Sequence, residues 1–103
     1  MSRRLEFLLN LTSKSTDPFA WYGLAMEYRS LARHEEAIAT FVALRARSPE
    51  YVPMYLMCGQ VLEGLGRLEE ARAWLESGIV VATAKGDAHA ASELQSALGA
   101  LSG

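Results

Sequence analysis

The chain has 103 residues, of which 50% are hydrophobic, enough for one domain with its own core. Its formal net charge is −2 and its basic residues are scattered, which excludes the basic patch of a nucleic-acid-binding protein. No apolar run approaches the roughly 20 residues that cross a bilayer, so no membrane span is expected. The single cysteine, Cys58, excludes an internal disulfide and fits a reducing compartment. We therefore predict one cytoplasmic domain over residues 1–103.

The first segment, residues 1–15, is predicted to form a short N-terminal helix. Two arginines precede apolar residues there, as in a secretion signal, but Glu6 and Asn10 interrupt the apolar run. We therefore assign the segment to the mature protein. Phe7 lies 34 residues before Phe41, a spacing that recurs further along the chain, so we expect the two side chains to take equivalent places in the fold.

Two helices are predicted between residues 18 and 48. Asp17 can accept hydrogen bonds from the free N–H groups of a first helical turn, and Pro18 has no N–H to leave unpaired there. Apolar residues then follow at helical spacing, namely Trp21, Leu24, Ala25, Tyr28 and Leu31. The second helix begins near His34 and ends before Pro49, whose ring disfavours helix at the preceding residue.

The same pattern returns 34 residues further along. Pro53 fits the first turn of a third helix. The buried stripe of that helix is predicted to comprise Tyr55, Cys58, Gly59 and Leu62. A fourth helix is predicted from Glu69 to about Ala84, with Gly86 as its C-terminal cap. From Asp87 a last helix has one apolar and one polar side, as a capping helix requires. Its apolar side comprises Ala90, Ala91, Leu94, Ala97, Leu98 and Leu101.

The repeat is visible when the chain is aligned with itself. Residues of the same character match at this spacing: Leu31 with Leu65, Arg33 with Arg67, and Glu35-Glu36-Ala37 with Glu69-Glu70-Ala71. The motif is Trp21-x-x-Leu24-Ala25-x-x-Tyr28, then Ala37-x-x-x-Phe41, then Pro49. It resembles the tetratricopeptide repeat family over residues 18–85. The end of the chain, from residue 86, also resembles small free-standing bacterial proteins of that kind.

The resemblance implies an all-α fold, a right-handed superhelix of antiparallel helix pairs with about six helices. The expected parts are an N-terminal helix (1–15), two repeats (18–51 and 52–85) and a capping helix (86–103). Both tryptophans lie on helix stripes and are expected to be largely buried.

The resemblance also implies a function, because such proteins usually hold another polypeptide in a concave groove lined by the first helix of each pair. We therefore expect a protein–protein interaction adaptor, not an enzyme, that presents an apolar groove to a helical or extended segment of a protein or peptide. The groove positions are Phe19, Tyr22, Gly23, Met26, Arg29, Ser30, Leu56, Met57, Gln60 and Glu63, with Ala90 and Leu94 from the cap. Phe19, Tyr22 and Met26 exceed what the packing stripe requires, and side chains of this kind suit an apolar partner.

Two alternatives remain open. The N-terminal helix or the capping helix can cover the groove, in which case its residues belong to the core. The chain can also be a self-assembling structural subunit, such as a homodimer. Leu5, Phe7, Leu8 and Leu9 favour this second alternative, because they place apolar residues on more than one side of the first helix.

The reactive and metal-binding side chains form no chemical site in the sequence. Cys58 lies in the packing stripe, so we expect a buried structural thiol. His34 is expected in a solvated turn, and His89 stands far from other ligands. The two pairs of adjacent glutamates are explained by repeated helix starts, where the helix dipole favours negative charge. We therefore predict no catalytic residues, no cofactor and no metal.

Overall fold

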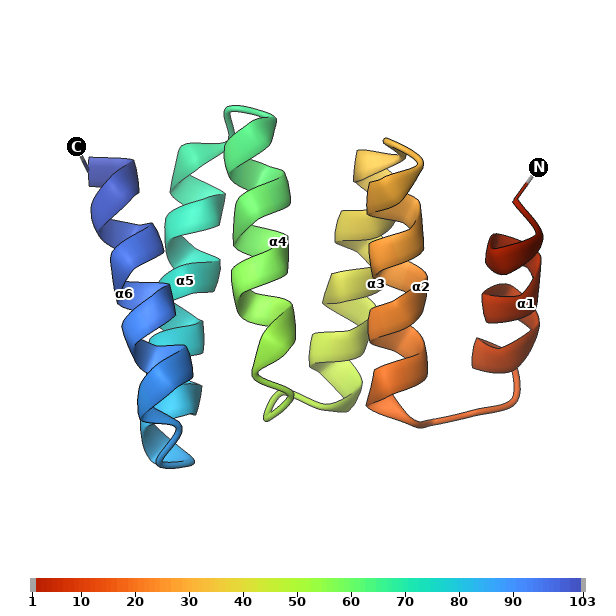
Figure 1. Ribbon diagram of the computed structural model, residues 1–103, viewed down its shortest axis with the longest axis horizontal. Helices are drawn as coiled ribbons and strands as arrows, with labels where there is room; N and C mark the ends of the chain where they lie inside the picture. Colours follow the sequence, from red (N-terminus) through yellow and green to blue (C-terminus); the bar gives the residue numbers. More distant parts are fainter. Residues whose placement is uncertain (1, 103) are drawn as a thin grey trace. The chain divides into compact units, whose positions relative to one another are not determined.

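The computed structural model describes residues 2–102, and Figure 1 shows helices joined by short connections. Six helices occur in this range: α1 (Arg3–Thr12), α2 (Pro18–Ser30), α3 (His34–Arg47), α4 (Pro53–Gly64), α5 (Leu68–Ala84) and α6 (Ala88–Ser102). The predicted all-α fold is thereby confirmed. The chain forms two compact units, Met1–Ser48 with α1 to α3 and Pro49–Gly103 with α4 to α6. That residues 1–103 are a single domain stays a prediction, and its end residues, 1 and 103, lie outside the described part.

The start of α2 follows from its sequence. The Asp17 Oδ1 atom accepts a hydrogen bond from the Phe19 N–H at 3.0 Å, and Pro18 occupies the first helical position. After α2 the chain turns through a bond from the Arg33 N–H to the carbonyl oxygen of Tyr28, at 2.9 Å. This bond satisfies one of the carbonyl groups that a helix end leaves unpaired, and α3 begins directly after it.

The turn after α2 recurs after α4 and after α5, with the same backbone bond across five residues at 2.9 Å. Such a turn needs a residue with positive φ, which glycine adopts without strain. Gly66 and Gly86 take this position with φ of 76° and 72°. After α2 the residue is Ala32, with φ of 60°. The predicted cap of α5 at Gly86 is confirmed, and the first repeat holds an alanine where the others hold glycine.

The core of the first unit lies between α2 and α3, which pack against each other. Its fully buried side chains are Ala25, Ala37, Phe41 and Leu44. The small alanines let the two helix backbones approach, and the ring of Phe41 fills the space between them.

The two tryptophans differ in their burial. Trp74, in the second unit, is 6% exposed, as predicted, and its ring lies 5.8 Å from that of Tyr55. Trp21 is less completely buried than Trp74, and it is not among the exposed large hydrophobic residues. Its indole N–H donates to the carbonyl oxygen of Ser15 at 3.1 Å, and the Arg47 guanidinium lies 4.3 Å from its ring centre. Trp21 therefore holds the connection between α1 and α2 against the helices of the first unit.

α1 packs on α2 through Leu5 and Leu8, which form a cluster with Leu24 and the half-buried Tyr28. Phe7 lies outside this cluster and is 63% exposed, whereas Phe41 is fully buried. The predicted equivalence of these two phenylalanines is therefore wrong.

The residues that lie 34 positions after the buried residues of α1 are exposed. Leu5, Leu8 and Thr12 are buried, whereas Ala39, Val42 and Ala46 of α3 are exposed. The 34-residue spacing therefore does not predict which side of α1 is buried. Apolar residues lie on both sides of α1, so the packing of α2 decides which side is buried.

In the second unit α5 packs against both α4 and α6. Two glycines permit these contacts. A Cβ atom on Gly59 would lie 2.8 Å from Leu75 Cδ2. A Cβ atom on Gly78 would lie 2.5 Å from Tyr55 Cβ and 3.0 Å from Leu94 Cδ2. The absence of a side chain at these positions allows the three helices to share one core.

Candidate functional site

The predicted binding residues of the first unit follow one side of α2, beside its buried stripe. The buried residues of α2 are Ala20, Leu24 and Ala25. Phe19 is 68% exposed, and Tyr22, Met26 and Arg29 are half-buried. The spacing of three, four and three residues places these four on one helix face. The structure thus leaves part of each predicted side chain accessible in the first unit.

Tyr22 also takes part in packing. Its ring meets that of Phe41 edge to face, with 6.4 Å between the ring centres and 60° between the planes. Burial raises the pKa of the Tyr22 hydroxyl, and the positive charge of Arg29 partly opposes this shift. Tyr22 therefore contacts the core through Phe41, while part of its side chain stays accessible.

The predicted binding residues of the second unit lie on α4. Leu56, Met57 and Gln60 are half-buried, and Glu63 is exposed. The fully packed positions of the same helix are Met54, Tyr55, Cys58, Gly59, Val61 and Leu62. The predicted set is therefore distinct from the buried stripe of α4. It combines two flexible apolar side chains with an amide and a carboxylate in the last two turns.

One of the predicted groove positions is packed inside its own unit. Leu94 is 1% exposed and lies against Gly78, so it belongs to the core of the second unit. The prediction that Leu94 contributes to an open groove is therefore wrong. Gly23 is partly exposed, and a Cβ atom there would lie 3.4 Å from Leu8 Cδ2 of α1.

The cysteine lies as predicted from the sequence, whereas one of the two histidines does not. Cys58 is fully buried, which confirms the predicted structural thiol. His34 is half-buried and its Nδ1 atom is buried without a hydrogen-bond partner, so a solvated turn is the wrong description. His89 is exposed, with its Nε2 atom 3.5 Å from a Glu93 carboxylate oxygen. Among residues 2–102 no group of three or more His, Cys, Asp or Glu side chains is placed to hold a metal ion.

The glutamates at the helix starts form the same ion pair in both repeats. Arg33 Nε donates to a Glu36 oxygen at 2.7 Å, and Arg67 Nε donates to a Glu70 oxygen at 3.0 Å. These hydrogen bonds lower the pKa of each glutamate. Both carboxylates are exposed, and each is paired with the arginine three residues before it at the start of its helix.

The arrangement of the helices is typical of one class of protein. Antiparallel helices joined by one recurring turn, with a recurring Arg–Glu pair, are the signature of a helical-repeat protein. No helix in the described part of the chain is long and apolar enough to cross a membrane.

The comparisons with known proteins identify the family. The model of the tetratricopeptide repeat family matches residues 28–101, and the chain therefore belongs to this family. None of the curated proteins compared with the chain matches it. The fold of this family generally mediates protein–protein interactions.

Solved structures agree with this assignment. The crystal structure of a tetratricopeptide repeat domain protein from Salinibacter ruber is 35% identical, with a TM-score of 0.78 over 84% of this chain and 96% of that one. A solution structure of a tetratricopeptide repeat domain protein from the same organism gives 35% identity and 0.79, over 82% and 86%. A protein from Bordetella parapertussis is 27% identical, with 0.83 over 99% of this chain and 90% of that one. The bacterial resemblance of the sequence is thereby confirmed.

Proposed function

We propose that the protein is an interaction adaptor that binds a segment of another protein through the accessible side chains of α2, and that α4 offers a second row of binding residues in its own unit. The observation that carries the proposal is the row of Phe19, Tyr22 and Met26 along α2, beside the buried stripe. Phe19 is 68% exposed in the first turn of its helix, where the core makes no use of it. An exposed aromatic residue beside partly accessible apolar ones favours binding of an apolar segment.

The chemistry of these residues suits a protein partner. Aromatic side chains dominate the binding energy of many interfaces, and methionine adapts its shape to irregular surfaces. Tyr22 is held by Phe41, so part of the surface is preorganised and loses little conformational entropy when a partner binds. Leu56 and Met57 offer the same kind of contact on α4.

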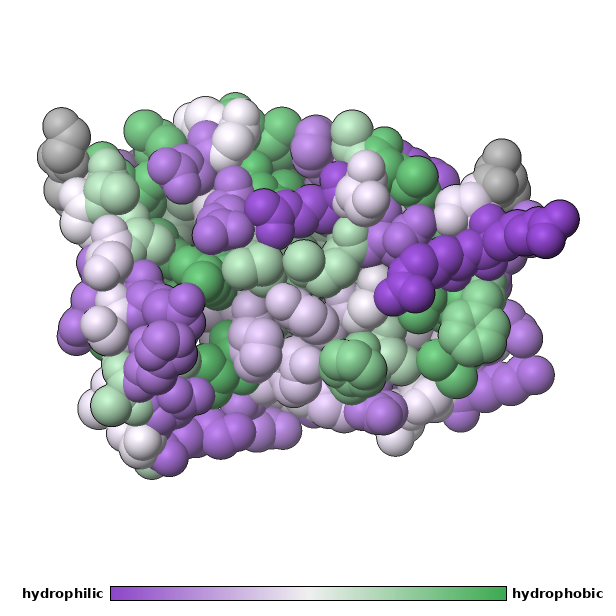
Figure 2. All heavy atoms as spheres, in the orientation of Figure 1, coloured by the Kyte–Doolittle hydropathy of each residue, from purple (hydrophilic) through white to green (hydrophobic). Residues whose placement is uncertain are grey.

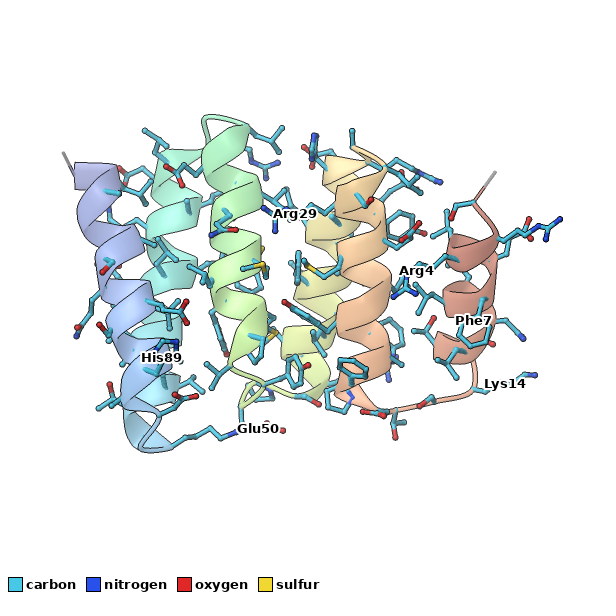
Figure 3. All side chains as sticks on the ribbon, viewed as in Figure 1. Arg4, Phe7, Lys14, Arg29, Glu50 and His89 are labelled. Carbon is cyan, nitrogen blue, oxygen red and sulfur yellow. The ribbon has the colours of Figure 1, made fainter. Side chains whose placement is uncertain are left out.

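Polar side chains at the ends of α2 and α4 are expected to fix the orientation of a bound segment. Arg29 lies in the last turn of α2 (Figure 3), and Glu63 lies in the last turn of α4. Gln60 adds an amide that can donate and accept hydrogen bonds. We expect the partner segment, helical or extended, to carry apolar residues for α2 and an acidic residue for Arg29. No role in catalysis is proposed for any of these side chains.

A pair of matched substitutions tests this function. Phe19→Ala should leave the melting temperature nearly unchanged, because the side chain is exposed, and should weaken binding of the captured partner by about 1–2 kcal/mol. Val80, which is 69% exposed on α5 outside the proposed surface, provides the control Val80→Ala. Calorimetric titration of both variants with the partner isolated on the wild-type protein measures the difference. Equal affinities of wild type and Phe19→Ala would contradict the proposal.

The alternative prediction, a self-assembling subunit, depends on α1. Phe7, Leu9 and Leu11 are each exposed there, which favours an interface through this helix. Light scattering over a wide concentration range tests it, and a monomer throughout would remove it. The basic residues on the same side of α1 as Phe7 would repel those of a second copy, which counts against self-assembly through this face. A cytoplasmic location stays a prediction.

A further inference from the structure

α1 has an outer face that the fold of the first unit does not use. Its inner side is buried through Leu5, Leu8 and Thr12. On the opposite side Phe7 is 63% exposed and Leu11 is 37% exposed. These two residues are four apart, so they are neighbours on one helix face. We call this side the α1 outer face, and it comprises Arg3, Phe7, Asn10 and Leu11 of α1 together with Lys14 in the turn after the helix.

The exposure of Phe7 does not result from a loosely attached helix. The Glu27 side chain on α2 is only 13% exposed and holds the start of α1. It accepts a hydrogen bond from the Ser2 hydroxyl at 2.9 Å and lies 3.3 Å from the Arg4 Nε. Ser2 also caps the helix by accepting from the Leu5 N–H at 3.1 Å. α1 is thus fastened at its N-terminus as well as along its leucines, and it presents the outer face in a fixed orientation.

Two exposed basic residues lie on this face. Arg3 lies four residues before Phe7, and Lys14 lies three residues after Leu11, so one basic residue stands at each end of the apolar pair. Both basic side chains are exposed. Glu6 lies about 100° from Phe7 around the helix, at the edge of the face beside Arg3 and Asn10. Figure 3 shows Arg4, Phe7 and Lys14 along α1, and Figure 2 shows hydrophobic beside strongly hydrophilic side chains there.

The basic character of this segment is local. Residues 2–15 contain three basic residues and one acidic residue, a formal charge of 3 − 1 = +2. The whole chain has a formal charge of −2, so the remainder carries −2 − 2 = −4. Arg4 is paired with Glu27, so Arg3 and Lys14 are the basic residues that lie beside the apolar pair on the outer face.

We propose that the α1 outer face is a second binding surface, and that its occupant is an acidic amphipathic helix of a partner protein. Apolar residues of the partner cover Phe7 and Leu11, and its carboxylates pair with Arg3 and Lys14. The exposed ring provides the anchor, and the two charges fix the position of the helix along α1. This surface is separate from the proposed binding residues on α2 and α4.

Two other occupants fit the charges less well. A second copy of α1 would bring the basic residues of both outer faces together, which opposes association. An anionic membrane would attract the basic residues, but two bulky side chains anchor a protein only marginally and the remaining charge of −4 is repelled. The acidic helix satisfies the apolar pair and both charges at once.

Amide chemical shifts of the full chain test the proposal with two synthetic peptides. One is an amphipathic helix of leucine and glutamate, and the other is the same peptide with lysine in place of glutamate. The glutamate peptide should shift the amide signals of α1 in a saturable manner, and the lysine peptide should not. Phe7→Ala and Arg3→Glu should each weaken this binding about tenfold or more. Val80→Ala and Lys85→Glu, which change exposed residues on and beside α5, should leave it within about twofold.

Several results would overturn the proposal. Equal shifts with both peptides, no shift at α1, or shifts confined to α2 and α4 would each remove the assigned occupant. Concentration-dependent α1 signals without peptide would assign the face to a second copy. Broadening of α1 signals by phosphatidylglycerol vesicles but not by the glutamate peptide would assign it to a membrane. None of these results depends on the Phe19→Ala binding test, so the two proposals fail separately.

Discussion

The two terminal helices of the chain complete their units in different ways. α6 buries Leu94 against Gly78 and exposes only polar or small residues on its other side. α1 buries Leu5 and Leu8 but also exposes Phe7 and Leu11. A helix that only closes a core needs no large apolar residue on its solvent side, and α6 has none among its described residues. α6 therefore serves as a cap, whereas α1 both packs on α2 and presents an apolar surface to solvent.

Removal of α6 should have the largest effect on stability. Truncation before Ala88 takes away Leu94 and leaves the packed side of α5 around Gly78 open to water. Full burial of one leucine contributes about 1.5–3 kcal/mol, so losing several apolar side chains removes most of the stability of a small domain. A thermal melt by circular dichroism should lose its cooperative transition. A truncated chain that melts like the full one would show that α6 is not a cap.

Within α1 the two faces should respond differently to substitution. Leu8→Ala should reduce the free energy of unfolding by about 2–5 kcal/mol, because the side chain is buried against α2. Phe7→Ala should change it by less than about 0.5 kcal/mol, because the ring is mainly in solvent. Urea denaturation of both variants measures the contrast. A large loss for Phe7→Ala would mean that the outer face belongs to the core.

Substitutions in the turns after α2 and α5 should have the smallest effect on stability. Ala32→Gly should stabilise the protein by up to about 1 kcal/mol, because it relieves a left-handed alanine at the cost of some chain entropy. Gly86→Ala at the equivalent turn before α6 should destabilise it by a similar amount. Nothing lies within 4 Å of a Cβ atom on Gly86, so conformation alone is tested there. Melting temperatures that shift in the same direction would contradict this account of the turns.

The repeat spacing predicts most of the fold, because two copies of one pattern define which residues face the core. The starts of α2 and α4 follow from Asp17, Pro18 and Pro53, and the ends of α4 and α5 follow from the turn glycines. α1 is different, since it has no second copy in the chain to fix its register. Its apolar residues on two sides made Phe7 look equivalent to Phe41, and only the packing against Leu24 distinguishes them.

The sequence predicts which helix positions of the candidate site are accessible, but not how far each side chain is buried by the neighbouring helices. The spacing of Phe19 and Met26 selects the accessible side of α2, as the structure has it. The contact of Tyr22 with Phe41 depends on how α3 lies against α2, which the sequence pattern does not specify. The position of Leu8 beside Gly23 depends on the rotation of α1 in the same way.

Mapping the partner's binding segment on the full chain by amide chemical shifts tests the central claim most directly. The account predicts saturable shifts along α2 from Phe19 to Arg29 and along α4 from Leu56 to Glu63, and none on the polar side of α6. Shifts confined to α6 or to the outer sides of α3 and α5, with α2 and α4 unchanged, would contradict it.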